Sequence, residues 1–376
     1  MSRIALTASG VHDGLNLHHT AALVLRDGIV EGISPLSDVP AGVALRDMGA
    51  GTLCPAFVDL QANGGGGVML NSQTDAAALR TMAQAHASTG TGWLLPTLIT
   101  DTPERTRAAV AAVKKVIEAD DTCIAGLHLE GPHLSHARRG AHDPALVRAM
   151  TTDDLSFLCN AARRLPVLLV TVAPESVSPE QIETLARAGV IVSLGHTDAG
   201  YDICRAAFAA GARMVTHLYN AMSQLGHRAP GLVGAALDTP GIAMGLIADG
   251  VHVHAAAIRV AQAARPEGLL LVTDSMATLG SEIGSFTLNG RVIQRAEGRL
   301  TLADGTLAGA DLTMTQAVHH MTSTVGLPPE TALAMATGRP GAVLGIDGAG
   351  RLLPGFPARV LYLAGAGAAP TVVATS

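Results

Sequence analysis

The hydrophobic positions of this chain follow two different patterns. Residues 1 to 52 alternate apolar and polar positions over short stretches such as Ala21–Leu25 and Gly28–Ile33. This alternation predicts a small β-sheet. From Leu53 onward, short continuous apolar runs alternate with longer amphipathic stretches. The runs predict eight buried strands, at residues 53–59, 92–98, 123–129, 166–172, 190–195, 213–216, 243–248 and 268–273.

The stretches between these runs have helical periodicity. In Glu104–Ala119, apolar residues recur at spacings of three and four, which predicts a helix that packs on one face. Pro179–Ala188 follows Ser178, a residue type that favours helix N-caps. Eight strands that alternate with helices predict the α/β class and a (β/α)8 TIM barrel.

Two later segments depart from the barrel pattern. Within 280–309, two strand-like stretches flank Asn289-Gly290, a pair typical of a two-residue hairpin turn, and this segment could act as a lid. Arg359–Leu363 is again strand-like and is expected to return to the N-terminal sheet. We therefore predict a barrel at 53–345 and a small β-sandwich domain formed by 1–52 and 346–376.

Length and composition limit the classes of protein. With 376 residues and 48% hydrophobic content, the chain can form a barrel and a small extra domain. A net charge of −6 without a long Lys/Arg run argues against nucleic acid or an anionic membrane as partner. The longest apolar run, Leu165–Ala173, is too short to span a membrane, and the first residues lack a signal-peptide core. Four scattered cysteines suit reduced thiols, so a cytoplasmic location is expected.

Three predicted strands end on a side chain that can bind a metal ion. Glu130 ends a run that contains no Arg or Lys to pair with it, and a buried carboxylate is costly without a cation. His196 and His217 end two other strands. One such histidine alone is more often a hydrogen-bonded core residue. One carboxylate and two imidazoles at the mouth of a barrel, however, match the ligands of a catalytic zinc ion.

Asp274 ends the eighth predicted strand, at the same mouth. By itself it could cap a helix or form an ion pair in a loop. Beside a metal site it is a candidate general base, because zinc lowers the pKa of a bound water to about 7 and that proton must be accepted.

Taken together, these motifs resemble the N-acetylglucosamine-6-phosphate deacetylases of the amidohydrolase superfamily. Their order and spacing agree from about residue 53 to 345, and chance does not plausibly explain a block such as Thr-His-Leu-Tyr-Asn-Ala-Met beside the others. The matching segments are Pro55–Gly64, His128–Pro132, Gly140–Pro144, Val172–Glu175, Gly195–Thr197, Thr216–Met222, Arg228–Gly231, Ile247–His252, Val272–Asp274 and Leu307–Met314.

The resemblance implies roles in catalysis. Glu130, His196 and His217 would bind the metal ion, and Asp274 would deprotonate the metal-bound water and then protonate the departing amine. His142 would hydrogen-bond the acetyl carbonyl and help to stabilise the oxyanion. Without the resemblance, the position of His142 in a loop would favour a surface role.

The resemblance also implies how a phosphorylated amino sugar is bound. The family binds the phosphate with backbone amides at the positions of Asn220 and Ala221, with His252, and with an Arg at 228 from a neighbouring subunit. A homodimer is therefore implied, and Leu307 matches a position that contacts the substrate. From the residues alone, Arg228 would more often be a solvated loop charge.

One departure bears on the number of metal ions. Many amidohydrolases carry His-x-His at the end of the first strand and bind a second ion there, but this chain has Gln61 and Asn63. Neutral amides are poor ligands for such a cation, and the family has a branch with this pair and one metal. We predict one divalent ion per subunit, zinc, and place His128 outside its ligands.

Several other functions share part of this residue pattern. A deacetylase for N-acetylgalactosamine 6-phosphate stays open, because the two sugars differ only at C4. A cyclic amidase of the dihydroorotase or hydantoinase type generally has the His-x-His pair. A Schiff-base aldolase needs a lysine at the site, whereas the only lysines are Lys114 and Lys115, on an outer helix. A non-catalytic sugar-phosphate sensor should have lost a ligand or the base, and none is lost.

Overall fold

The structure is a computed structural model that describes residues 3–119, 122–365 and 367–374. Contacts within the chain divide it into two compact units. The first consists of Met1–Asp59, Ala87–Trp93 and Thr313–Ser376, and the second of Leu60–His86 and Leu94–Leu312. All the residues expected to form the site belong to the second unit.

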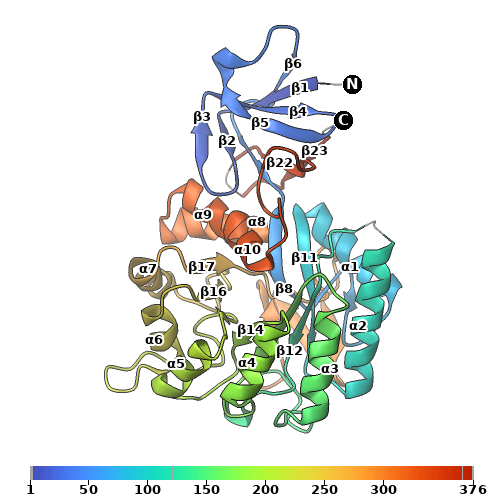
Figure 1. Ribbon diagram of the computed structural model, residues 1–376, viewed down its shortest axis with the longest axis vertical. Coiled ribbons are helices and arrows are strands. Elements are labelled where there is room, and N and C mark those ends of the chain that lie inside the picture. Colours follow the sequence, from blue (N-terminus) through green and yellow to red (C-terminus); the bar gives the residue numbers. More distant parts are fainter. Residues whose placement is uncertain (1–2, 120–121, 366, 375–376) are drawn as a thin grey trace. The chain divides into compact units, whose positions relative to one another are not determined.

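A sheet of eight strands forms the barrel, as expected (Figure 1). Neighbouring strands from β11 to β17 are parallel. A parallel bridge between Ala62 and Ser275 joins the end of the first strand to the segment that follows the last strand. The fold class is therefore confirmed. The strands are β8 Phe57–Ala62, β11 Thr91–Ile99, β12 Leu127–Glu130, β13 Leu168–Val172, β14 Ile191–Leu194, β15 Met214–Val215, β16 Ala243–Leu246 and β17 Leu269–Leu271.

The first predicted strand, 53–59, was wrong in its extent. The chain forms two strands here: β7 (Thr52–Pro55) pairs with β2 and β22 in a different sheet, and β8 begins at Phe57. Every residue from Leu53 to Ala62 is buried. Continuous burial leaves no polar position to mark where one strand ends and the next begins.

Helices follow most barrel strands and cover the outside of the sheet, as the ribbon shows for α2 to α5 (Figure 1). Thr102 caps α2 and Ser178 caps α4 through a reciprocal capping box, so both predicted helices are confirmed. The helices are α1 Ala76–Ser88, α2 Pro103–Glu118, α3 Thr152–Ala162, α4 Pro179–Arg187, α5 Tyr201–Ala209, α6 Gly231–Asp238 and α7 Ala255–Ala264.

The predicted hairpin after the barrel belongs to a four-stranded antiparallel sheet. Its turn residues Asn289 and Gly290 both have positive φ, as a two-residue hairpin requires. Leu288 and Ile293 contribute to a small core of this sheet. Ala310 N–H donates to the Asp274 carbonyl at 2.9 Å, so the sheet is joined to the end of the barrel. The strands are β18 Ser285–Leu288, β19 Arg291–Ala296, β20 Arg299–Thr301 and β21 Leu307–Ala310.

The first unit contains two sheets, in the orders β5-β4-β1-β6 and β23-β22-β7-β2-β3. Residues of both sheets share one core, which confirms the predicted sandwich and the return of the C-terminal tail. Its helices are α8 Met314–His320, a π-helical turn Met321–Val325, α9 Pro329–Ala336 and α10 Gly338–Leu344. The strands are β1 Arg3–Thr7, β2 Gly10–His12, β3 Leu17–His19, β4 Ala21–Arg26, β5 Ile29–Pro35, β6 Ala44–Asp47, β22 Val360–Leu363 and β23 Thr371–Val373.

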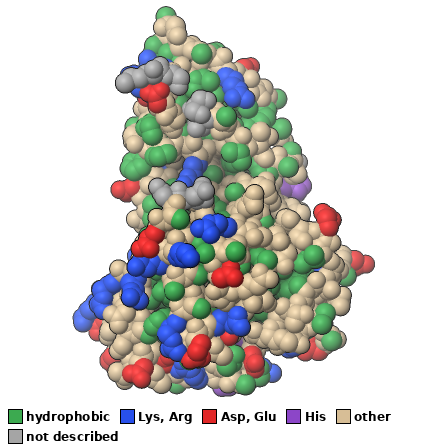
Figure 2. Space-filling view, turned by 90° about the vertical axis from the view of Figure 1, so that its right-hand side faces the viewer, with side chains coloured by type: hydrophobic (Ala, Val, Ile, Leu, Met, Phe, Trp, Pro, Cys, Tyr) green, Lys and Arg blue, Asp and Glu red, His purple; other side chains and the backbone are tan. Residues whose placement is uncertain are grey.

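Some charged side chains on the outer helices pair with one another. Arg107 contacts Glu104 and Arg187 contacts Glu183 within single helices. Figure 2 shows Lys and Arg interspersed with Asp and Glu over the face that it presents. Among the described residues, no helix has the length and hydropathy needed to cross a membrane.

Candidate active site

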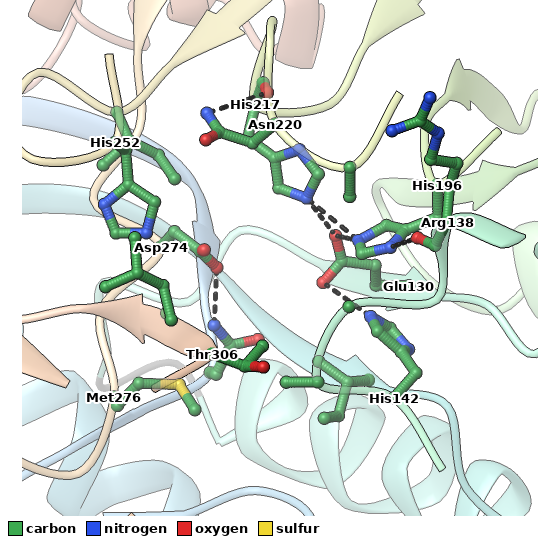
Figure 3. A pocket seen from close by; sticks show the side chains of 18 of the residues that line it. Glu130, Arg138, His142, His196, His217, Asn220, His252, Asp274, Met276 and Thr306 are labelled. Carbon is green, nitrogen blue, oxygen red and sulfur yellow. Dashed lines mark hydrogen bonds and ion pairs between the residues drawn. The ribbon is translucent and has the colours of Figure 1, made fainter. Parts of the chain in front are cut away.

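A cavity of about 360 Å³ lies in the second unit, at the carboxyl ends of the barrel strands (Figure 3). In parallel α/β barrels this end carries the active site. Of the residues predicted for the site, all but Arg228 line the cavity. They are Glu130, His142, His196, His217, Asn220, Ala221, His252, Asp274 and Leu307.

The three predicted metal ligands form a small triangle. Nε2 of His196 lies 3.0 Å from Nε2 of His217, and Oε1 of Glu130 lies 3.3 and 3.1 Å from these two nitrogens. Three ligand atoms at about 2.0–2.1 Å from one tetrahedral zinc ion would be about 3.3 Å apart. The spacing and the donor types therefore fit a single ion.

Glu130 is held in its ionised form, the form in which a carboxylate binds a metal ion. Burial alone would raise the pKa of Glu130, but hydrogen bonds and attraction from His196 and His217 hold it well below its ordinary value.

Ligand atoms of His142 also lie near Glu130 and His196. His142 Nε2 is 3.9 Å from Glu130 Oε2, however, a longer separation than any within the triangle. We therefore retain His217 as the third ligand.

The loop after β12 orients His196. The carbonyl of Arg138 lies 2.8 Å from His196 Nδ1, so Nδ1–H donates to it and Nε2 is left for the metal. The backbone of His196, His217 and Asp274 lies in the left-handed region, with φ of 48°, 31° and 49°. Residues other than glycine adopt this region rarely, and such strain concentrates at functional sites.

His142 is a buried histidine and not the surface residue that its loop position alone would suggest. Thr100 N–H donates to His142 Nδ1 at 3.3 Å, and Thr100 Oγ1 lies 2.7 Å from the same nitrogen. With Nδ1 as the acceptor, the proton of a neutral ring sits on Nε2. Burial, and next the nearby His196, keep the pKa of His142 well below its ordinary value. His142 is thus a neutral N–H donor that lines the cavity.

Asp274 lies across the cavity from His142 (Figure 3). Its Oδ1 accepts hydrogen bonds from Asn63 Nδ2 at 2.7 Å and Gln61 Nε2 at 3.0 Å. Gln61 Nε2 also lies 3.2 Å from Glu130 Oε1. Burial, followed by repulsion from Glu130, raises the pKa of Asp274 to about 6. A carboxylate of this kind can accept and return a proton near neutral pH.

Three of the residues predicted to bind the phosphate also line the cavity. Asn220 and Ala221 line it, and Ala221 has a positive φ of 48°. His252 also lines it, with Nδ1 2.6 Å from Asp249 Oδ2, so the opposite edge of the ring is available to a ligand. Arg228 lies instead in an exposed loop.

Several residues of the site were not predicted from the sequence. Thr100 follows β11 directly, so the strand-end rule that found Glu130 could have found it. Arg138 lines the cavity and pairs with Asp198 at 2.8 Å. It precedes the Gly140–Pro144 motif, but nothing in its spacing marks a contact with His196. The bonds of Gln61 and Asn63 to Asp274 were not expected either.

Comparison with known proteins identifies the family of this chain. Residues 52–374 match the model of the amidohydrolase family. The chain belongs to this family. It is 42% identical over 331 residues to the N-acetylgalactosamine-6-phosphate deacetylase of Shewanella sp. (strain ANA-3), covering 86% of this chain and 83% of that protein. It is 35% identical over 329 residues to the N-acetylglucosamine-6-phosphate deacetylase of Haemophilus influenzae, covering 87% and 86%.

Solved structures of this amidohydrolase group have the same fold. The N-acetylglucosamine-6-phosphate deacetylase from Pasteurella multocida superposes with a TM-score of 0.90 at 33% identity, covering 96% of this chain and 95% of that one. The Mycobacterium smegmatis enzyme gives 0.91 at 32% identity, covering 99% and 98%. The resemblance drawn from the motifs is confirmed. The family is metal-dependent, and this member has a Glu and His cluster that can hold an ion.

Proposed function

We propose that this amidohydrolase removes the acetyl group of N-acetylglucosamine 6-phosphate, releasing glucosamine 6-phosphate and acetate, in amino-sugar catabolism and cell-wall sugar recycling. The observation that carries the proposal is the Glu130, His196 and His217 triangle in one cavity with Asp274 and His142. The names of the relatives from Haemophilus influenzae and Pasteurella multocida support the substrate.

The side chains have complementary roles in this reaction. A bound divalent ion, for which we propose zinc, supplies Lewis-acid activation of water and of the carbonyl. Asp274 accepts the proton of the attacking water through Oδ2, because Oδ1 already accepts two hydrogen bonds. It then delivers this proton to the leaving nitrogen. His142 Nε2–H donates to the carbonyl oxygen as negative charge develops there.

We assign the phosphate to the part of the cavity that Asn220, Ala221 and His252 line. The backbone N–H of Ala221 and the ring of His252 would bind it, together with the backbone N–H of Asn220, which donates to the His217 carbonyl at 2.9 Å when no phosphate is bound. We propose that Arg228 reaches the cavity of a neighbouring subunit in a homodimer, and its exposed position leaves it available for this. Leu225, in the same loop, is 52% exposed and would be covered by that subunit. A cytoplasmic location and the domain boundaries at 52 and 345 also remain proposals.

A panel of substrates tests this function. We expect acetate release from N-acetylglucosamine 6-phosphate, loss of release when a chelator removes the ion, and a rate at least about a hundred-fold lower on unphosphorylated N-acetylglucosamine, because charge-assisted bonds to the phosphate are lost. The measurement is kcat/KM from an acetate assay. Equal kcat/KM on the free and phosphorylated sugar would remove the role given to His252 and Arg228.

The same panel decides a second candidate, the galactosamine epimer. The specific observation in its favour is that the Shewanella relative, which is 42% identical, is an N-acetylgalactosamine-6-phosphate deacetylase. A kcat/KM that is tenfold higher on N-acetylgalactosamine 6-phosphate would reassign the substrate. The catalytic proposal would be unaffected.

One metal ion per chain is the next expected result. Where a second ion would need histidines, this chain has amide groups that donate N–H to Glu130 and Asp274. In these two hydrogen bonds, oxygens of Glu130 and Asp274 that a second ion would need as ligands already accept N–H groups. Elemental analysis of the dialysed protein should give a ratio near one, and two zinc ions per chain would contradict this reading of Gln61 and Asn63.

A further inference from the structure

Asn63 follows β8 and lines the cavity, with 2% of the residue exposed. Its Nδ2 lies 2.7 Å from Asp274 Oδ1. An ionised carboxylate only accepts hydrogen bonds, and Asp274 must be ionised to take a proton from water. The nitrogen of the Asn63 amide therefore faces Asp274, and its oxygen points in another direction.

That oxygen, Oδ1 of Asn63, is buried and has no hydrogen-bond partner within the part of the chain that the structure describes. Buried polar atoms in native proteins are nearly always hydrogen-bonded, so such an acceptor in an active site calls for a partner. Gln61 makes a similar bond to Asp274 Oδ1, at 3.0 Å, but is not among the described residues that line the cavity. Of the two amides, Asn63 is therefore the one placed to touch a substrate.

We propose that Asn63 Oδ1 accepts a hydrogen bond from the N–H of the substrate's acetamide group. This inference rests on the proposed function and adds a residue that touches the reacting nitrogen. Asp274 must reach the same nitrogen to protonate it. The Asn63 amide contacts Asp274 Oδ1, the oxygen next to Oδ2, and both residues line the same cavity, so one substrate nitrogen can meet both side chains.

The chemistry explains why such an acceptor helps. The water oxygen bonds to the carbonyl carbon and its proton passes to Asp274. The C–N bond then breaks as nitrogen takes that proton, and acetate and the amine leave. Once nitrogen is tetrahedral, its lone pair must face the proton on Asp274 while its N–H points elsewhere. An acceptor that holds the N–H fixes this orientation before the proton moves.

The test compares an amide with an ester. The substrates are N-acetylglucosamine 6-phosphate and the 2-O-acetyl ester of glucose 6-phosphate, which has no N–H. The variants are Asn63→Ala and Asn63→Ser. Gln61→Ala is the control: it removes a donor to Asp274 and Glu130 but no residue that lines the cavity. For Asn63→Ala we expect kcat/KM to fall at least about tenfold more on the amide than on the ester. For Gln61→Ala the two losses should agree within about twofold.

Each outcome is decisive. Equal losses on amide and ester for the Asn63 variants would mean that Asn63 acts only by positioning Asp274, and would overturn the proposal. Metal content and melting temperature, measured for every variant, ensure that folded and loaded enzymes are compared. Failure of the proposed function is distinguishable, because the wild-type enzyme itself would then release no acetate from the amide. That result would overturn both proposals.

Discussion

Asp274→Asn is expected to lower kcat for acetate release at least about a thousand-fold while the fold and the metal content stay unchanged. An amide nitrogen in place of Oδ2 has no lone pair to take the proton of water. The amide oxygen of the substitute can still accept the hydrogen bonds that Gln61 and Asn63 donate to Oδ1, so the buried network survives. The measurement is kcat together with zinc per chain and the melting temperature.

Asp153→Asn is the matched control for this variant. Asp153 is exposed in the first turn of α3 and lies outside the residues that line the cavity, so the same chemical change there should leave kcat unaltered. If the folded, zinc-loaded Asp274 variant kept more than about a tenth of the wild-type kcat, Asp274 would not be the base. His142 would not replace it, because its Nδ1 accepts a hydrogen bond from Thr100 N–H and its low pKa keeps it neutral.

The positions of the principal site residues could be predicted from two things: the local pattern of apolar runs, and the rule that the carboxyl ends of barrel strands carry the active site. Glu130, His196, His217 and Asp274 each end an apolar run or follow it within two residues. In a parallel barrel all such ends meet at one mouth. The pattern needs no knowledge of side-chain conformation, and it brought together residues as far apart as Glu130 and Asp274.

The contacts between those residues and their neighbours could not be predicted in the same way. Gln61 meets Glu130 across 69 positions, and Thr100 meets His142 across 42. Such bonds depend on strand register and rotamers, which no periodicity encodes. The left-handed backbone at His196 and His217 gives no sequence signal either, because neither position is a glycine.

The boundary between β7 and β8 could not be predicted from the sequence, for a related reason. The switch from β7 to β8 occurs within a segment whose residues are all buried, so apolar character continues across two sheets. The hairpin at Asn289-Gly290, in contrast, was predicted because its turn type restricts the residues that fit. Elements could therefore be predicted from the sequence where the local backbone conformation limits the choice of residue. An element boundary could not be predicted where burial was the only constraint on the residues.

His217→Ala is expected to release the metal ion and to lower kcat for acetate release at least about a thousand-fold. His217 Nε2 lies 3.0 Å from His196 Nε2 and 3.1 Å from Glu130 Oε1, so its loss leaves two donors where a catalytic zinc ion takes three from the protein. Zinc per chain after dialysis, and zinc affinity by competition with a chromogenic chelator, measure the change. We expect less than about a tenth of an equivalent to remain.

His142→Ala is the informative companion, because His142 is the other imidazole near Glu130 and His196. His142 is proposed to donate a hydrogen bond to the acetyl carbonyl and not to bind the metal ion. Its removal should therefore lower kcat while one zinc ion per chain is retained. The two variants therefore separate metal binding from carbonyl activation. Were His217→Ala to keep a full equivalent of zinc while His142→Ala lost it, the third ligand would be His142. The longer 3.9 Å separation of its Nε2 from Glu130 Oε2 would then have to shorten when the ion binds.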